Sequence, residues 1–94
     1  MKKRVALLSI IVSDKGEIAK LNSYLSEASE YVIGRMGIPY RERNINIISI
    51  AIDAPQDFIS ALSGKIGRLE GVSSRTTYSD VITDGEGSGE EDHA

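Results

Sequence analysis

The sequence predicts a single α+β domain in which the elements follow the order β-α-β-β-α-β, and three observations lead to this fold class. Two nearly unbroken aliphatic runs, at residues 4–12 and 45–52, are typical of strands in the middle of a sheet. An amphipathic stretch with helical spacing follows each run. A chain of 94 residues is long enough for one domain only. Together these features predict a ferredoxin-like sandwich, a four-stranded antiparallel sheet with two helices on one face.

The first strand and the first helix are predicted from residues 4–28. The aliphatic run contains Ser9, is far too short to span a membrane, and is followed by no small-residue cleavage site of a signal peptide. Asp14 stands three residues before Glu17, which is the spacing of a helix-capping box. The apolar stripe of the helix then consists of Ile18, Leu21, Leu25 and Ala28.

The second and third strands are predicted from residues 31–33 and 45–52. The first of these stretches is β-prone but short, because Gly34 and Gly37 interrupt it. Residues 37–44 contain a proline and several charged side chains, a composition that predicts a turn. The stretch after the turn has Ile at five of its eight positions, so we expect a strand in the centre of the sheet.

The second helix and the last strand complete the domain. Asp53 is expected to cap the helix, with Pro55 in its first turn. The apolar face of this helix consists of Phe58, Ile59, Leu62, Ile66 and Leu69. Residues 72–78 alternate and are mostly polar, which predicts an edge strand. Later residues are rich in Gly, Ser and acids, so we expect residues 1–79 to form the domain and residues 80–94 to form a disordered acidic tail.

In a monomer of this fold, the face of the sheet opposite the helices is exposed to water and is normally polar. In this chain the sequence predicts that the same face is apolar. Both central strands carry aliphatic side chains on this face too, with Leu7 and Ile11 in the first strand and Ile45, Ile47 and Ala51 in the third. An exposed patch of this kind is large for a soluble monomer. We therefore expect two copies to pack these faces together, or to join sheet edges, in a twofold dimer. Cover by the acidic tail is the alternative, which the polarity of the tail disfavours.

Composition excludes several classes of chemistry. The chain has no cysteine, which removes disulfides, thiolate metal sites and cysteine nucleophiles and fits a reducing cytoplasm. The only histidine is His93, so no Ser–His pair forms within the predicted domain. The glycine patterns match neither a P-loop nor a dinucleotide-binding motif. We therefore expect neither an enzyme nor a bound metal or cofactor.

Binding to nucleic acid is not expected either. RNA-recognition motifs stack bases on aromatic side chains of their sheet, and the two predicted central strands contain no aromatic residue. No helix-turn-helix pattern is present, so direct DNA binding is not expected. The net charge of −3 conceals an asymmetry, because residues 1–79 hold eleven basic and eight acidic side chains while residues 80–94 hold six acidic ones. The predicted domain is thus mildly basic and the predicted tail acidic.

Three stretches resemble a known family: residues 31–40 (YVIGRMGIPY), residues 47–50 (IISI), and residues 53–74 with the segments DAP, SALSGKIG and GVSS. Together, over about residues 5–78, they resemble the small ACT-like proteins known as iron-only hydrogenase system regulators. The resemblance implies an ACT-like variant of the ferredoxin-like fold and assembly into a dimer or higher oligomer. It also implies association with the maturation or expression of [FeFe]-hydrogenase. It carries over no catalytic residue.

The resemblance also implies a place for a ligand, because ACT domains bind small effectors, often amino acids, near the loop after strand one and at subunit interfaces. In this chain residues 12–16 are similar to the Asp-x-x-Gly loop of ACT domains, with one residue fewer. Arg35 offers a fork of donors that suits a carboxylate or phosphate. The candidate ligand-binding residues are Ser13, Asp14, Gly16, Arg35, Gly37 and Tyr40.

The leading hypothesis is a cytoplasmic regulatory protein that forms a homodimer or higher homo-oligomer and binds a small effector or a partner protein. The second hypothesis is an interaction module without a small ligand, which docks on a hydrogenase maturation enzyme or on a transcription factor. Neither hypothesis involves a membrane.

Overall fold

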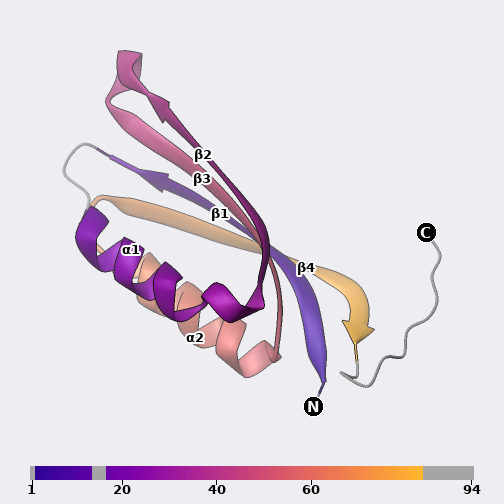
Figure 1. Ribbon diagram of the computed structural model, residues 1–94. Coiled ribbons are helices and arrows are strands. Elements are labelled where there is room, and N and C mark those ends of the chain that lie inside the picture. The colour runs from indigo at the N-terminus through magenta and orange to yellow at the C-terminus, as the bar shows by residue number, and fades with distance from the viewer. Residues whose placement is uncertain (1, 14–16, 84–94) are drawn as a thin grey trace.

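The computed structural model describes residues 2–13 and 17–83 (Figure 1). The predicted order of elements is confirmed. The strands are β1 (Lys3–Val12), β2 (Val32–Tyr40), β3 (Ile45–Ala54) and β4 (Val72–Thr83), the helices are α1 (Ile18–Glu27) and α2 (Gln56–Gly67), and short 3₁₀ turns span Ser29–Tyr31 and Arg41–Arg43. The two helices form one layer against one face of the sheet, which is the predicted ferredoxin-like α+β arrangement (Figure 1).

The four strands form one antiparallel sheet in the order β2-β3-β1-β4. The two aliphatic strands, β1 and β3, therefore lie in the centre, as their composition predicts. Leu8 faces Ile50 across this central pair, and Arg35 of β2 faces Ile50 from the other side. The hairpin of β2 and β3 extends beyond the helix layer, so its tip has no helix beneath it (Figure 1).

The core lies between the sheet and the helices and is aliphatic. Every second residue of each central strand points into it, and each helix contributes its apolar stripe. Among the described residues no polar or charged residue is buried as a whole. The most deeply buried side chains are Leu8, Ile10, Val12, Leu21, Ile50, Ile52, Ile59 and Ile66.

β2 is longer than the sequence predicts, which corrects the expectation of a strand over residues 31–33 and a turn over residues 37–44. The strand continues through both glycines to Tyr40 because its partner β3 supplies an unbroken ladder. Gly34 and Gly37 are accommodated on this edge with open space where a Cβ would lie. Pro39 is tolerated because an edge strand can turn the position that lacks an N–H group outward. The real turn is shorter and ends at Asn44, which has a left-handed backbone (φ 55°).

The predicted cap of α2 is wrong. Asp53 remains in β3, where it pairs with Val5, and the residue before the helix is Pro55. The ladder between β1 and β3 continues through Ala54, so the backbone of Asp53 is still paired as a strand and is not at the start of the helix. Within the described residues, the Oδ1 atom of Asp53 is buried and has no hydrogen-bond partner.

α1 begins at Ile18, and Glu17, which the predicted capping box would place inside the first turn, is the residue before the helix. Asp14 lies outside the described residues. The carboxylate of Glu17 accepts a hydrogen bond from the backbone N–H of Glu70 (3.1 Å) and pairs with Lys20 (3.3 Å). The backbone N–H of Glu17 donates to the carbonyl of Glu70 (3.3 Å). Glu17 therefore attaches the beginning of α1 to the segment before β4.

β4 extends five residues beyond the predicted end of the last strand. Thr83 pairs with Lys3 and Ile82 with Arg4, after an irregularity of register next to Arg4. The expected boundary at residue 79 therefore falls inside this strand. The remainder of the expected tail, residues 84–94, lies outside the described residues.

Candidate functional site

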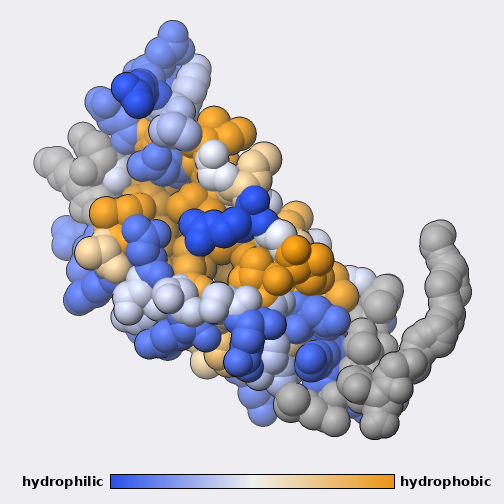
Figure 2. All heavy atoms as spheres, in the orientation of Figure 1, coloured by the Kyte–Doolittle hydropathy of each residue, from blue (hydrophilic) through white to orange (hydrophobic). Residues whose placement is uncertain are grey.

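The open face of the sheet, opposite the helices, carries a set of apolar side chains, interrupted in the two central strands by the facing pair Ser9 and Ser49. We call it the open-face patch, and it consists of Leu7, Ile11, Met36, Ile38, Tyr40, Ile45, Ile47 and Ala51. The five largest exposed members, Leu7, Ile11, Met36, Ile38 and Tyr40, are 42–49% exposed. Viewed from the side shown in Figure 2, hydrophobic atoms also reach the surface along the β2 side of the sheet, next to the hydrophilic hairpin tip.

The register of the sheet places the patch in rows that run across three strands. Ile11 of β1 faces Ile47 of β3, which faces Ile38 of β2. A second row joins Leu7 to Ala51. Residues directly opposite each other in a sheet point to the same face, so these side chains are neighbours. The patch is therefore a preformed surface carried by three hydrogen-bonded strands.

β4 forms a polar border along one side of the patch. The residues of β4 opposite Ile11, Ser9 and Leu7 are Ser73, Arg75 and Thr77. These side chains share the open face with the patch, because their partners do. An apolar centre with a polar border is the arrangement found in protein–protein interfaces.

A hollow of about 240 Å³ lies where the patch meets this border. Leu7, Ala51 and Thr77 contribute to its wall, together with Val5, Ala6, Tyr78 and Ser79. The hollow is open and mostly apolar, so a protruding apolar side chain suits it better than a charged ligand.

The ligand-binding candidates that the structure describes lie at different places on the sheet. The backbone N–H of Ser13 donates to the carbonyl of Gly71 (2.8 Å) just after β1. Tyr40 lies on the open face opposite Ile45, and its hydroxyl donates to the Oε1 atom of Glu42 (2.9 Å). Arg35 and Gly37 lie on the other face, because their partners Ile50 and Ile48 point into the core.

Asp14 and Gly16, the other two candidates for the ligand site, lie outside the described residues. The ligand site therefore stays a prediction. The patch residues expected from sequence, Leu7, Ile11, Ile45, Ile47 and Ala51, do share the open face. Sequence reasoning missed Met36 and Ile38, because it ended the second strand at residue 33; their alternation with Arg35 and Gly37 was the available signal.

One carboxylate at the loop end of the domain has a shifted pKa. The pKa of Glu17 lies below its ordinary value of 4.5, because its carboxylate accepts the backbone N–H of Glu70 and, secondarily, bonds to Lys20. Among residues 2–13 and 17–83, no cluster of three or more His, Cys, Asp or Glu side chains could hold a metal ion. Within the same residues, no helix has the length and apolarity needed to cross a membrane.

The fold and the open face define a small ferredoxin-like domain of the kind suggested by the sequence resemblance, and comparison with known proteins confirms the family. A family model, TM1266-like, matches residues 4–76. The family is provisionally described as "Iron-only hydrogenase system regulator". The chain belongs to this family.

Two solved structures are similar to this chain. One is the uncharacterized protein TM1266 from Thermotoga maritima, with 38% sequence identity and a TM-score of 0.78 over 81% of this chain and 96% of that one. The other is a formyltetrahydrofolate deformylase from Pseudomonas putida KT2440, with 16% identity and a TM-score of 0.56 over 78% of this chain and 28% of that one. The second likeness shows the fold alone, and this chain spans less than a third of the deformylase. No curated protein matches the chain.

Proposed function

We propose that this protein acts as a homodimeric regulator in an iron-only hydrogenase system, and that two copies meet through the open-face patch. The observation that carries the proposal is the exposure of Leu7, Ile11, Met36, Ile38 and Tyr40 on one rigid face. Large contiguous apolar patches on small domains are typical of interaction sites. The family description supports the regulatory role.

The patch is large enough to support association. Burying apolar surface contributes roughly 25 cal/mol per Å², so each 100 Å² contributes about 2.5 kcal/mol. Five large apolar side chains, each about half exposed, supply on the order of several hundred Å² per copy. When both copies bury this area, the free energy gained is comparable to the cost of association, about 4–15 kcal/mol.

A second copy of the chain fits the patch better than an unrelated surface does. A twofold axis places the same surface of each copy against the other, so the aliphatic rows meet aliphatic rows. The polar border of Ser73, Arg75 and Thr77 then lies at the edge of the interface, where it remains hydrated.

Effector binding, in this proposal, is linked to assembly. The candidate ligand residues are Ser13, Asp14, Gly16, Arg35, Gly37 and Tyr40. Arg35 and Tyr40 lie on opposite faces of β2, so a small ligand that contacts both is favoured at the edge of this strand or between two copies. An amino acid or a nucleotide offers the carboxylate or phosphate that an arginine fork binds.

A direct test of assembly is the mass in solution. Multi-angle light scattering at about 10–100 µM should give twice the chain mass of 10.2 kDa. A mass equal to one chain over this range would remove the dimer and transfer the patch to the second hypothesis, a module that docks on a maturation enzyme or a transcription factor. The hollow in the patch is open and mostly apolar, which favours that second hypothesis over a buried small-molecule site.

Effector binding is tested by a thermal-shift screen of amino acids and nucleotides on the native chain and on Arg35→Ala. A ligand that raises the melting temperature of the native chain should raise that of Arg35→Ala less. An unchanged shift in the variant would remove Arg35 from the site.

A further inference from the structure

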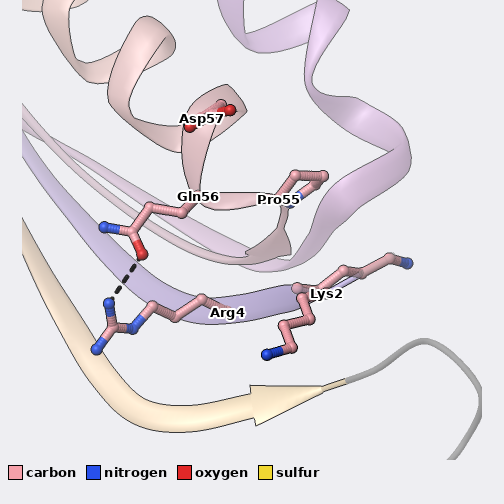
Figure 3. A pocket seen from close by; sticks show the side chains of 6 residues that line it. Lys2, Arg4, Pro55, Gln56 and Asp57 are labelled. Carbon is pink, nitrogen blue, oxygen red and sulfur yellow. Dashed lines mark hydrogen bonds between the residues drawn. The ribbon is translucent and has the colours of Figure 1, made fainter.

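A basic pocket lies at the end of the sheet where β1 begins, far along the strand from the loop that follows it. The pocket has a volume of about 300 Å³ and is lined by Lys2, Lys3, Arg4, Pro55, Gln56 and Asp57. Figure 3 shows the side chains of Lys2 and Arg4 on the β1 side of this space, with the first turn of α2 on the opposite side. Neither the ligand candidates described above nor the open-face patch includes any of these residues.

Arg4 is held in a fixed position in the wall of the pocket. Its Nε atom donates to the carbonyl of Ser79 (2.8 Å), and its Nη1 atom donates to the Oε1 atom of Gln56 (2.9 Å) (Figure 3). Its guanidinium also lies 5.4 Å from the centre of the Tyr78 ring. These two hydrogen bonds use two of the five N–H donors of an arginine. A guanidinium already held in place loses little conformational entropy when it binds an anion.

The first turn of α2 forms the opposite wall and adds donors. The N–H of Phe58 already donates to the carbonyl of Pro55 (3.0 Å). The N–H groups of Gln56 and Asp57 precede it, and at this position in a helix an N–H has no acceptor within the helix. The helix dipole places a partial positive charge at the same point. Among the lining residues that the structure describes, Asp57 is the only acid, so their three cations and one anion give a formal charge of +2.

We propose that the basic pocket binds a phosphate group. Its oxygens would accept hydrogen bonds from the guanidinium of Arg4 and from the N–H groups at the start of α2, while Lys2 and Lys3 balance the charge. A phosphate monoester carries close to two negative charges at neutral pH, which matches the net charge of the lining better than a single carboxylate does. The volume is sufficient for a small phosphate ester.

Two sources of oxyanions have to be distinguished in the test of this pocket. One is a phosphate compound in solution. The other is the chain itself, because Thr83 pairs with Lys3, and residues 84–94, which follow Thr83, contain five carboxylate side chains. A tethered carboxylate competes at a high effective concentration. The experiment therefore needs one arm for each source.

The first arm is a titration of the full chain with inorganic phosphate, followed by ¹⁵N–¹H correlation spectra at low salt. We expect the largest shifts at the amides of Arg4, Gln56 and Asp57. The double variant Lys2→Gln/Lys3→Gln should weaken phosphate binding by about fivefold to twentyfold. Asp57→Asn should strengthen it by about twofold to fivefold, because a like charge is removed. The control is Arg41→Gln/Arg43→Gln, which removes the same charge from the exposed hairpin tip.

The second arm repeats the titration on a full chain in which the acids of residues 84–94 are replaced by Asn and Gln. An unchanged affinity supports a pocket that takes phosphate from solution. A several-fold tighter affinity, with shifted Arg4 and Gln56 amides before phosphate is added, supports the same pocket occupied by the chain's own carboxylates. Two results overturn the proposal: the absence of shifts at the pocket amides in both chains, or an equal loss of affinity in the pocket and hairpin-tip double variants. The open-face patch shares no residue with this pocket, so substitutions in the patch should leave phosphate binding unchanged.

Discussion

Ile11 of β1 and Ile47 of β3 face each other across the central strand pair, and both side chains lie on the face of the sheet that no helix covers. The next residue of the row is Ile38 of β2, which is 45% exposed. Directly behind them, on the other face, Ile10 and Ile48 are buried in the core. The central strands are thus aliphatic on both sides, but the fold uses only one side.

A charge placed in the patch should dissociate the proposed dimer without unfolding the chain. We expect Ile38→Glu to give the mass of a single chain at about 10 µM, because a carboxylate buried between two apolar faces loses its hydration. Ile38 lies on an edge strand, so the substitution does not disturb the core. The control is Ile18→Glu on α1, since Ile18 has a similar exposed fraction of 42% and lies off the open face. If both variants keep the mass of the native chain, the patch is not the interface.

The two faces of β3 should respond differently to the same substitution. Ile50 is 1% exposed, so Ile50→Ala should lower the free energy of unfolding by about 2–5 kcal/mol at any protein concentration. Ile47 is half-buried on the open face, so Ile47→Ala should cost about 1 kcal/mol in a single chain. In a dimer this cost should grow with protein concentration, because subunit binding stabilises the folded state by mass action. Urea unfolding of the two variants at protein concentrations of about 2 µM and 200 µM measures both costs. A cost for Ile47→Ala that does not change with concentration contradicts the proposed interface.

The central part of the fold follows directly from the sequence, because β1 and β3 are long and aliphatic and can only lie in the middle of a sheet. The edge strand β2 could not be predicted in the same way. Gly34, Gly37 and Pro39 have poor intrinsic strand propensity, and the pairing with β3 overrides it. The helix cap predicted at Asp53 was wrong for a related reason. An acid shortly before a proline favours a helix cap, but pairing with β1 keeps Asp53 in β3.

Part of the candidate site was also accessible from sequence. The apolar alternation in β1 and β3 predicts the open-face patch, whereas the contribution of β2 depends on the unpredicted length of that strand. The basic pocket joins residues 2–4 to residues 55–57, and no local spacing connects two segments so far apart. Only the ladder between β1 and β3, which pairs Arg4 with Ala54, brings them together.

The hairpin turn should depend on the backbone freedom of Asn44. This residue has φ 55°, in the left-handed region, where a β-branched side chain is strained. We expect Asn44→Val to lower the free energy of unfolding by about 1–2 kcal/mol and Asn44→Gly to change it by less than about 0.5 kcal/mol. Thermal or urea unfolding of the two variants provides the comparison. Equal destabilisation would show that the side chain of Asn44, rather than its backbone, determines the turn.

The contact between Glu17 and the segment before β4 should make stability depend on pH. The pKa of Glu17 is lowered in the folded chain, so the folded state favours the ionised carboxylate. The stabilisation of the folded state by Glu17 is therefore complete at pH values above its ordinary pKa of 4.5. This stabilisation is lost as the pH falls through the lower pKa of the folded state. We expect the native chain to melt above Glu17→Gln at pH 7, and the gap between their melting temperatures to narrow steadily below pH 4.5. Glu27→Gln is the matched control, because Glu27 is an exposed carboxylate that forms an ion pair of similar length with Lys65 (3.4 Å). A gap for Glu17→Gln that stays constant down to acid pH would mean that the carboxylate does not stabilise the fold through its charge.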